Sequence, residues 1–107
     1  MALATRIVAP KTAKKGDIVE IKTLINHIME TGFRRDNMGR AVPRDIITRM
    51  RCIYAGEEVF AMDMFTGVAA NPFVAFTTIA TQTGTLVFEW TDMKGEVTRA
   101  EATLTVT

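Results

Sequence analysis

Cysteine, histidine and long apolar runs are scarce in this sequence, and each scarcity excludes something. The only cysteine, Cys52, cannot form an internal disulfide, so cysteine usage does not reveal the redox compartment. A metal site usually needs several histidine, cysteine or carboxylate ligands together, and no such cluster surrounds the only histidine, His27. We therefore expect no metal and no cofactor. No run approaches the ~18 apolar residues of a membrane-spanning helix, so we expect no membrane association.

An excess of charge of one sign is also lacking. The 107 residues include 13 Lys and Arg against 12 Asp and Glu, which gives a net charge of +1. Nucleic-acid binding is disfavoured, because it relies on a basic face with interleaved aromatic residues. With 48% hydrophobic and 23% charged residues, the composition is that of a globular protein, and the length suits a single domain, residues 1–107.

Apolar residues recur with a period of two residues, which predicts strands, and no segment sustains the 3.6-residue period of a helix. In the segment 17–29, for example, Val19, Ile21, Ile25, His27 and Met29 share one parity. Turn signals separate about seven such segments, at residues 6–9, 17–29, 46–54, 59–64, 73–80, 85–91 and 97–106. Short strands without intervening helices predict an all-β fold, an immunoglobulin-like antiparallel β-sandwich.

The loop after residue 29 is the most distinctive segment. Six of the 13 basic residues fall between Arg34 and Arg51, against only Asp36 and Asp45 as local acids. Loops of about a dozen residues inside compact domains are usually functional or mobile. We expect residues 34–44 to form an exposed loop that docks an acidic partner or small oxyanions through its arginines, and the alternative is a solvated loop face. The candidate partner-binding arginines are Arg34, Arg35, Arg40 and Arg44.

A second candidate contact surface lies at the end of the fourth predicted strand, residues 59–64. Met62 and Met64 alternate with Asp63 beside Phe65, and methionine side chains adapt readily to partners. A small domain with 48% hydrophobic residues has limited interior. We therefore expect some apolar surface to remain exposed in the monomer and to be covered by a partner or by a second copy of the chain.

His27 and Cys52 each have a structural and a chemical interpretation. Because His27 shares the parity of the apolar positions, we expect a hydrogen-bonded, partly buried imidazole at a strand end. The chemical alternative is a small enzyme that uses His27 together with Glu30. Cys52 has the parity of Met50 and Tyr54, so we expect a buried, unmodified thiol.

Motifs spread along nearly the whole chain resemble one known family. They are the loop His27-x-Met29-Glu30-Thr31-Gly32-x-Arg34-Arg35-Asp36, then Gly39, Pro43-Arg44-x-Ile46-Ile47, Asn71-Pro72-Phe73, and Phe88-x-Trp90-x-Asp92 with Gly95. In this order and spacing the sequence resembles SoxZ, a subunit of the sulfur-oxidising (Sox) carrier complex.

The resemblance implies an immunoglobulin-like scaffolding subunit rather than an enzyme. Such a subunit pairs with SoxY, whose C-terminal arm carries the cysteine that holds thiosulfate-derived intermediates, and the pair visits other Sox enzymes in the periplasm. The sequence shows no apolar signal-peptide core, which alone would indicate the cytoplasm. The resemblance implies instead export with a signal-bearing partner. The remaining alternative is an immunoglobulin-like adaptor for some other protein.

Overall fold

The computed structural model describes residues 3–107, and among these residues it contains eight strands and no helix. Within this part of the chain, accordingly, nothing helical is available to cross a bilayer. The strands are β1 (Thr5–Val8), β2 (Thr12–Ala13), β3 (Ile18–Ile25), β4 (Ile47–Tyr54), β5 (Glu57–Asp63), β6 (Phe73–Ile79), β7 (Gly84–Asp92) and β8 (Val97–Val106). All seven predicted strands are confirmed within a few residues, and the two-residue β2 is an addition.

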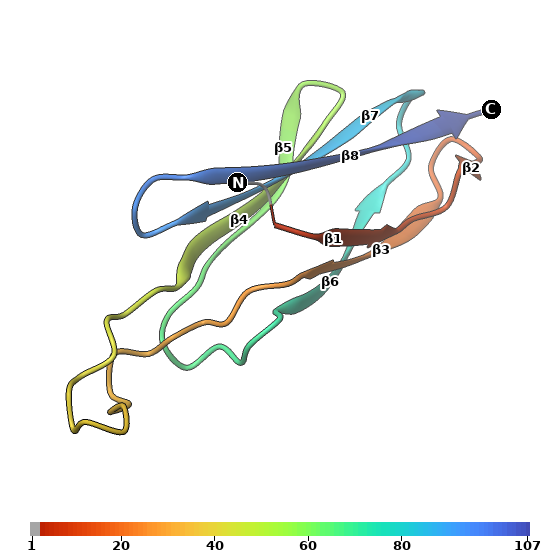
Figure 1. The fold of residues 1–107 in the computed structure, drawn as a ribbon. Coiled ribbons are helices and arrows are strands. Elements are labelled where there is room, and N and C mark those ends of the chain that lie inside the picture. Colours follow the sequence, from red (N-terminus) through yellow and green to blue (C-terminus); the bar gives the residue numbers. More distant parts are fainter. Residues whose placement is uncertain (1–2) are drawn as a thin grey trace.

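The strands form two sheets that face each other as a sandwich (Figure 1). The smaller sheet has the order β1-β3-β6 and is antiparallel throughout. The larger sheet has the order β2-β8-β7-β4-β5 and is antiparallel except where β2 runs parallel to β8. The predicted all-β sandwich is therefore confirmed, with one short parallel pair that the sequence did not indicate.

The core lies between the two sheets and is filled by the alternating apolar positions. Ile21 and Ile25 project from the smaller sheet, and Phe88 and Leu104 from the larger, all fully buried. The rings of Phe60 and Phe76 stack across the two sheets with centroids 4.3 Å apart. Full burial of each large apolar side chain stabilises the sandwich by roughly 1.5–3 kcal/mol.

The tight hairpins follow from residues that tolerate positive φ. The β4–β5 turn consists of Ala55 and Gly56, with φ of 50° and 83°, the geometry of a two-residue turn that matches the twist of the flanking strands. At the β7–β8 turn, Gly95 has φ 85°, and the Asp92 carboxylate accepts backbone N–H bonds from Lys94 and Glu96, each 2.9 Å long. Both turns stand where the sequence predicts them.

Strand β3 ends at Ile25, earlier than the predicted end at Met29. The buried alternation continues through His27 and Met29, but the backbone leaves the sheet. The reason is local: the His27 N–H donates to the Asn71 side-chain oxygen at 3.0 Å, and the Asn71 N–H donates back to the His27 carbonyl at 2.7 Å. An asparagine side chain thus replaces the strand partner and releases the chain toward the long loop.

Candidate functional site

The long loop projects from one end of the sandwich, and a pair of backbone hydrogen bonds closes its base (Figure 1). The Glu30 N–H donates to the Asp45 carbonyl at 2.8 Å, and the Asp45 N–H donates to the Glu30 carbonyl at 2.9 Å. A second bridge joins Arg35 and Ala41 farther out. The loop is therefore a ribbon with a defined backbone rather than a loose connection.

Asp36 organises the tip of the ribbon. Its Oδ1 accepts the backbone N–H groups of Met38 and Arg40 at 2.9 and 3.0 Å, and its Oδ2 accepts from Arg40 Nε at 3.2 Å. The Arg40 backbone bond, which outweighs the opposing effect of burial, holds the pKa of this carboxyl below its ordinary value. Gly39 completes the turn with φ 78°.

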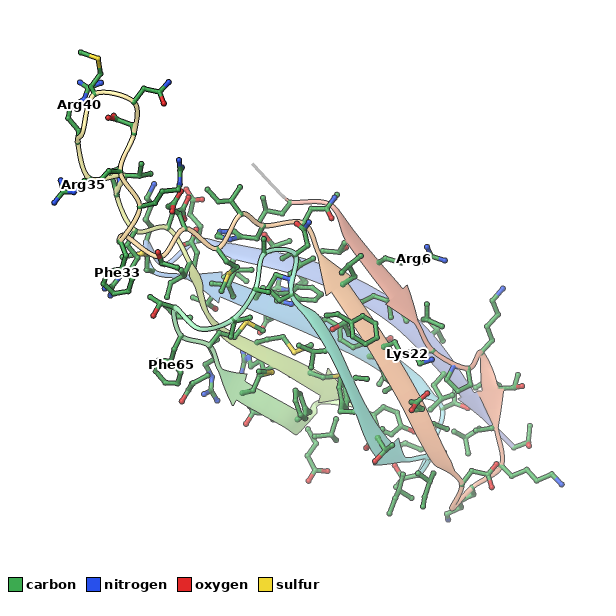
Figure 2. The ribbon with its side chains drawn as sticks, turned by 90° about the horizontal axis from the view of Figure 1, so that it is seen from below. Arg6, Lys22, Phe33, Arg35, Arg40 and Phe65 are labelled. Carbon is green, nitrogen blue, oxygen red and sulfur yellow. The ribbon has the colours of Figure 1, made fainter. Side chains whose placement is uncertain are left out.

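All four candidate arginines are exposed, as predicted for the 34–44 loop. Figure 2 shows Arg35 and Arg40 directed away from the sheets at the outer part of the loop. Their surroundings differ, however. Arg40 pairs with Asp36 at 3.2 Å, whereas Arg35 donates to the Gly39 carbonyl at 2.9 Å and has no acidic partner among residues 3–107.

An acid outside residues 34–44 also pairs with one of these arginines. Arg34 pairs with Glu30 at the base of the loop, with its Nη2 2.6 Å from Glu30 Oε1. The hydrogen bond from Arg34 holds the pKa of the Glu30 carboxyl below its ordinary value. Arg44 donates to the Thr31 carbonyl at 3.2 Å. Within the part of the chain that the structure describes, Arg35 and Arg44 are thus the loop arginines without an acidic partner.

Met62, Met64 and Phe65 do not form a common surface. The inclusion of Met64 is wrong, because only 1% of it is exposed and its backbone N–H bonds the Thr48 carbonyl, which draws it into the core. Met62 is half-buried on β5. Phe65 is 70% exposed, and Figure 2 places it at the same end of the molecule as the exposed Phe33.

His27 is a buried, hydrogen-bonded imidazole just beyond β3, as predicted. Its Nδ1 accepts the Met29 backbone N–H at 2.9 Å, so in the neutral ring the proton resides on Nε2. That Nε2 lies 3.5 Å from Asp45 Oδ1. No hydrogen bond or ion pair joins His27 to Glu30 among the described residues, so the suggested pair does not meet.

Cys52 lies in the centre of β4, between Phe60 of β5 and Phe88 of β7, and is 0% exposed. Burial raises the pKa of its thiol to about 12. The predicted buried thiol is confirmed. Residues 3–107 also contain no grouping of three or more histidine, cysteine or acidic side chains that could hold a metal ion.

Sequence reasoning missed a cleft beside the base of the loop. It has a volume of about 700 Å³ and is bounded by the residues after β3 and by the β7–β8 hairpin. Its lining includes His27, Asp45, Trp90, Asp92 and Thr98. The spacing of these residues in the sequence could not predict that they lie close together, because they meet only when the two sheets pack against each other. The Phe88-x-Trp90-x-Asp92 motif by itself does not indicate a cavity.

Residues 6–103 match the sequence profile of the family described as sulphur oxidation protein SoxZ. No curated protein sequence matches the chain significantly. The profile covers the loop, the cleft except for Leu3, and every strand except part of the first and last.

Solved structures share the sandwich at low sequence identity. A superoxide reductase (neelaredoxin) of Ignicoccus hospitalis superposes with a TM-score of 0.77 at 16% identity, over 99% of this chain and 82% of its own. The sulfur carrier protein SoxY of Chlorobium limicola f thiosulfatophilum gives 0.69 at 19% identity, over 97% and 79%. At these identities the likeness shows a common fold and nothing about activity. The family assignment comes from the sequence profile, which extends from β1 into β8: this chain belongs to the SoxZ family of sulfur-oxidation proteins.

Proposed function

We propose that this chain is the scaffolding subunit of a SoxYZ carrier, in which SoxY holds thiosulfate-derived intermediates covalently and this chain helps to present them to the Sox enzymes. The observation that carries the proposal is the state of Cys52. A thiol that is 0% exposed, with a pKa raised to about 12, can neither reach nor attack a sulfur substrate. Since no other cysteine exists in the chain, cysteine-bound sulfur must reside on a partner.

The geometry of His27 and Glu30 supports a role without catalysis. Glu30 is held by Arg34, and His27 Nδ1 is occupied by the Met29 N–H. A general base needs an unoccupied nitrogen or carboxylate oxygen that can take a proton from the substrate. Here the acceptor nitrogen of His27 and the carboxylate of Glu30 already have other partners. We propose accordingly that the chain acts by binding and not as an enzyme.

The partner and the location belong to the same proposal. The family implies a pairing with SoxY, and we propose a SoxYZ heterodimer that acts in the periplasm after export with its signal-bearing partner. Exposed apolar side chains such as Ile18 and Ile79, which lie opposite each other on β3 and β6, support an assembly. A surface of that kind is normally covered in the working complex.

Light scattering with and without SoxY tests the proposal. We expect the chain alone to self-associate as its concentration rises, and an equimolar SoxY to convert it into a defined complex. Thiosulfate oxidation by the reconstituted Sox enzymes should require both subunits, and the isolated chain should be inactive on thiosulfate. A chain that stays monomeric and does not bind SoxY, or that oxidises thiosulfate alone, contradicts the proposal. Defined binding to a protein outside the Sox system would favour the adaptor alternative.

A further inference from the structure

The cleft beside the loop base has the dimensions and lining of a binding site. Its volume of about 700 Å³ lies within the ~300–1,000 Å³ of typical ligand sites. One wall consists of Asn26, His27 and Ile28 after β3, and the other of the β7–β8 hairpin with Val97. Figure 1 shows both segments at the end of the sandwich from which the long loop projects.

Trp90 lines this cleft and carries a hydrogen-bond donor that is not used within the described residues. Its side chain is 1% exposed, and its Nε1 is the buried side-chain nitrogen or oxygen that finds no partner among residues 3–107. Leaving a buried donor unsatisfied costs free energy, because the N–H group has lost its hydrogen bond to water and gains none in return. An acceptor brought by a ligand would recover this energy, and the neighbouring lining residue Thr98, paired with Trp90 across β7 and β8, is also polar and buried.

A second donor stands on the opposite wall. Because His27 Nδ1 accepts from Met29, the Nε2 position carries the proton, and Asp45 Oδ1 lies 3.5 Å from it. This distance exceeds a normal hydrogen bond. The residues that line the cleft therefore include two side chains with N–H donors, Trp90 on β7 and His27 on the segment after β3.

The charges around the cleft decide which acceptor is admitted. Three carboxylates line it, those of Asp45, Asp92 and Glu96, against one amine, that of Lys94. A sulfur oxyanion would meet repulsion there, whereas a neutral carbonyl would not. The half- to largely exposed side chains of Ile28 and Val97 add apolar surface at the rim. The lining therefore suits a ligand with carbonyl acceptors, apolar groups and positive charge. An extended peptide with basic side chains has all three.

We propose that this cleft binds an extended, basic segment of SoxY, one of whose main-chain carbonyls accepts a hydrogen bond from Trp90 Nε1. The inference deepens the proposed function by naming where the partner docks, and it rests on that function for the identity of the partner. It is independent of the exposed loop arginines, which would meet partners of the opposite charge.

The single tryptophan makes the inference directly measurable. A chain labelled with ¹⁵N has one indole N–H resonance, that of Trp90, and unlabelled SoxY can be titrated into it. We expect this resonance to move downfield and its hydrogen exchange to slow as the complex forms. Backbone amide resonances elsewhere report complex formation itself. If those amides shift while the indole does not, SoxY binds at another surface and the inference is overturned, although the proposed function stands. If nothing shifts, both fail.

A matched pair of variants tests the position of the site. Val97→Arg places a bulky positive charge at the rim, and Val8→Arg makes the same change on β1 at nearly the same exposure, 51% against 50%. We expect Val97→Arg to weaken SoxY binding by roughly tenfold or more and Val8→Arg to change it less than about twofold. Equal weakening by both variants, or none by Val97→Arg, would overturn the assignment.

A titration with thiosulfate alone tests whether the cleft binds a sulfur oxyanion instead of a peptide. Added to the labelled chain without SoxY, it should leave the indole resonance in place, because the three carboxylates disfavour an anion. A saturable shift of the indole by thiosulfate would show that the cleft takes a sulfur oxyanion and would overturn the peptide assignment.

Discussion

Gly32 packs directly against Arg44, and a Cβ added to Gly32 would lie 3.1 Å from the Arg44 Cβ. Gly32 also has φ 88°, a conformation that side chains disfavour. The contact stands just outside the Glu30–Asp45 bridge, where the two arms of the loop come together. The absence of a side chain at this one position thus allows the ribbon to close.

Gly32→Ala should therefore loosen the loop. The added methyl group meets Arg44 and the positive φ becomes strained, at a cost of about 1–3 kcal/mol. We expect a lower melting temperature together with faster tryptic cleavage after Arg34 and Arg35. Gly67→Ala is the control, since a Cβ there has no atom within 4 Å and no positive φ is required. Equal thermal stability of the two variants would show that the contact yields without strain.

The loop charge should govern encounter with the other Sox enzymes. Arg35 is the better site for reversal, because Arg34 is neutralised by Glu30 and Arg40 by Asp36. Exposed charges contribute little to stability but raise association rates strongly. We expect Arg35→Glu to slow turnover by the reconstituted enzymes roughly three- to tenfold at low salt, with nearly unchanged thermal unfolding and a defect that shrinks as salt screens the charge.

Lys11→Glu is the matched control for this charge reversal. Lys11 is exposed and immediately precedes β2, which Figure 1 places at the opposite end of the molecule from the loop. It changes the net charge by the same amount without altering the loop. If both variants slow turnover equally, the effect comes from net charge, and if neither does at low ionic strength, the loop is only a solvated face.

The sequence predicted what depends on local pattern and missed what depends on partners brought together by folding. Period-two alternation placed Val19 and Cys52 in the core, because strand geometry alone assigns those faces. The prediction that Met64 lies on a contact surface is wrong, because the pattern of its segment does not show that the chain beyond the end of β5 directs this side chain into the core. The Arg34–Glu30 pair could have been predicted from the sequence, because the two residues are only four positions apart. The cleft at Trp90 could not, because it forms only where the two sheets meet.

Cys52 should behave as an inert core residue. With its pKa raised to about 12, the thiolate fraction at pH 8 is about 10⁻⁴, and burial blocks access as well. We expect a disulfide reagent such as DTNB to label the native chain at least about 100-fold more slowly than the urea-unfolded chain. Cys52→Ala should lower the free energy of unfolding by about 1–2 kcal/mol and leave sulfur-dependent turnover intact. A sulfur adduct on Cys52 detected by mass spectrometry during turnover would contradict this.

Glu89 should make the sandwich sensitive to acid. It is buried on β7 beneath two guanidinium groups: Arg99 of β8 donates to its Oε2, and Nη2 of Arg51 on β4 lies 2.6 Å from its Oε1. The Arg99 hydrogen bond, opposed by burial and helped by Arg51, holds the pKa of Glu89 below its ordinary 4.5. The folded state therefore takes up this proton less readily than the unfolded state. The stabilisation is complete above the unfolded pKa and is lost as pH falls through the lowered folded pKa.

Glu89→Gln removes both the charge and its titration. We expect the variant to lose about 1–2 kcal/mol of unfolding free energy at pH 7, because hydrogen bonds to a charged group are replaced by weaker ones. As pH falls below the unfolded pKa of about 4.5, the difference from the natural chain should narrow, because protonation then favours the unfolded state of the natural chain until the folded Glu89 is protonated as well. Glu57→Gln is the control, as Glu57 is exposed and has no ion pair among residues 3–107. Urea unfolding at pH 7 and at pH 3 measures both, and a deficit that stays constant with pH would mean that Glu89 acts through packing and not through its charge.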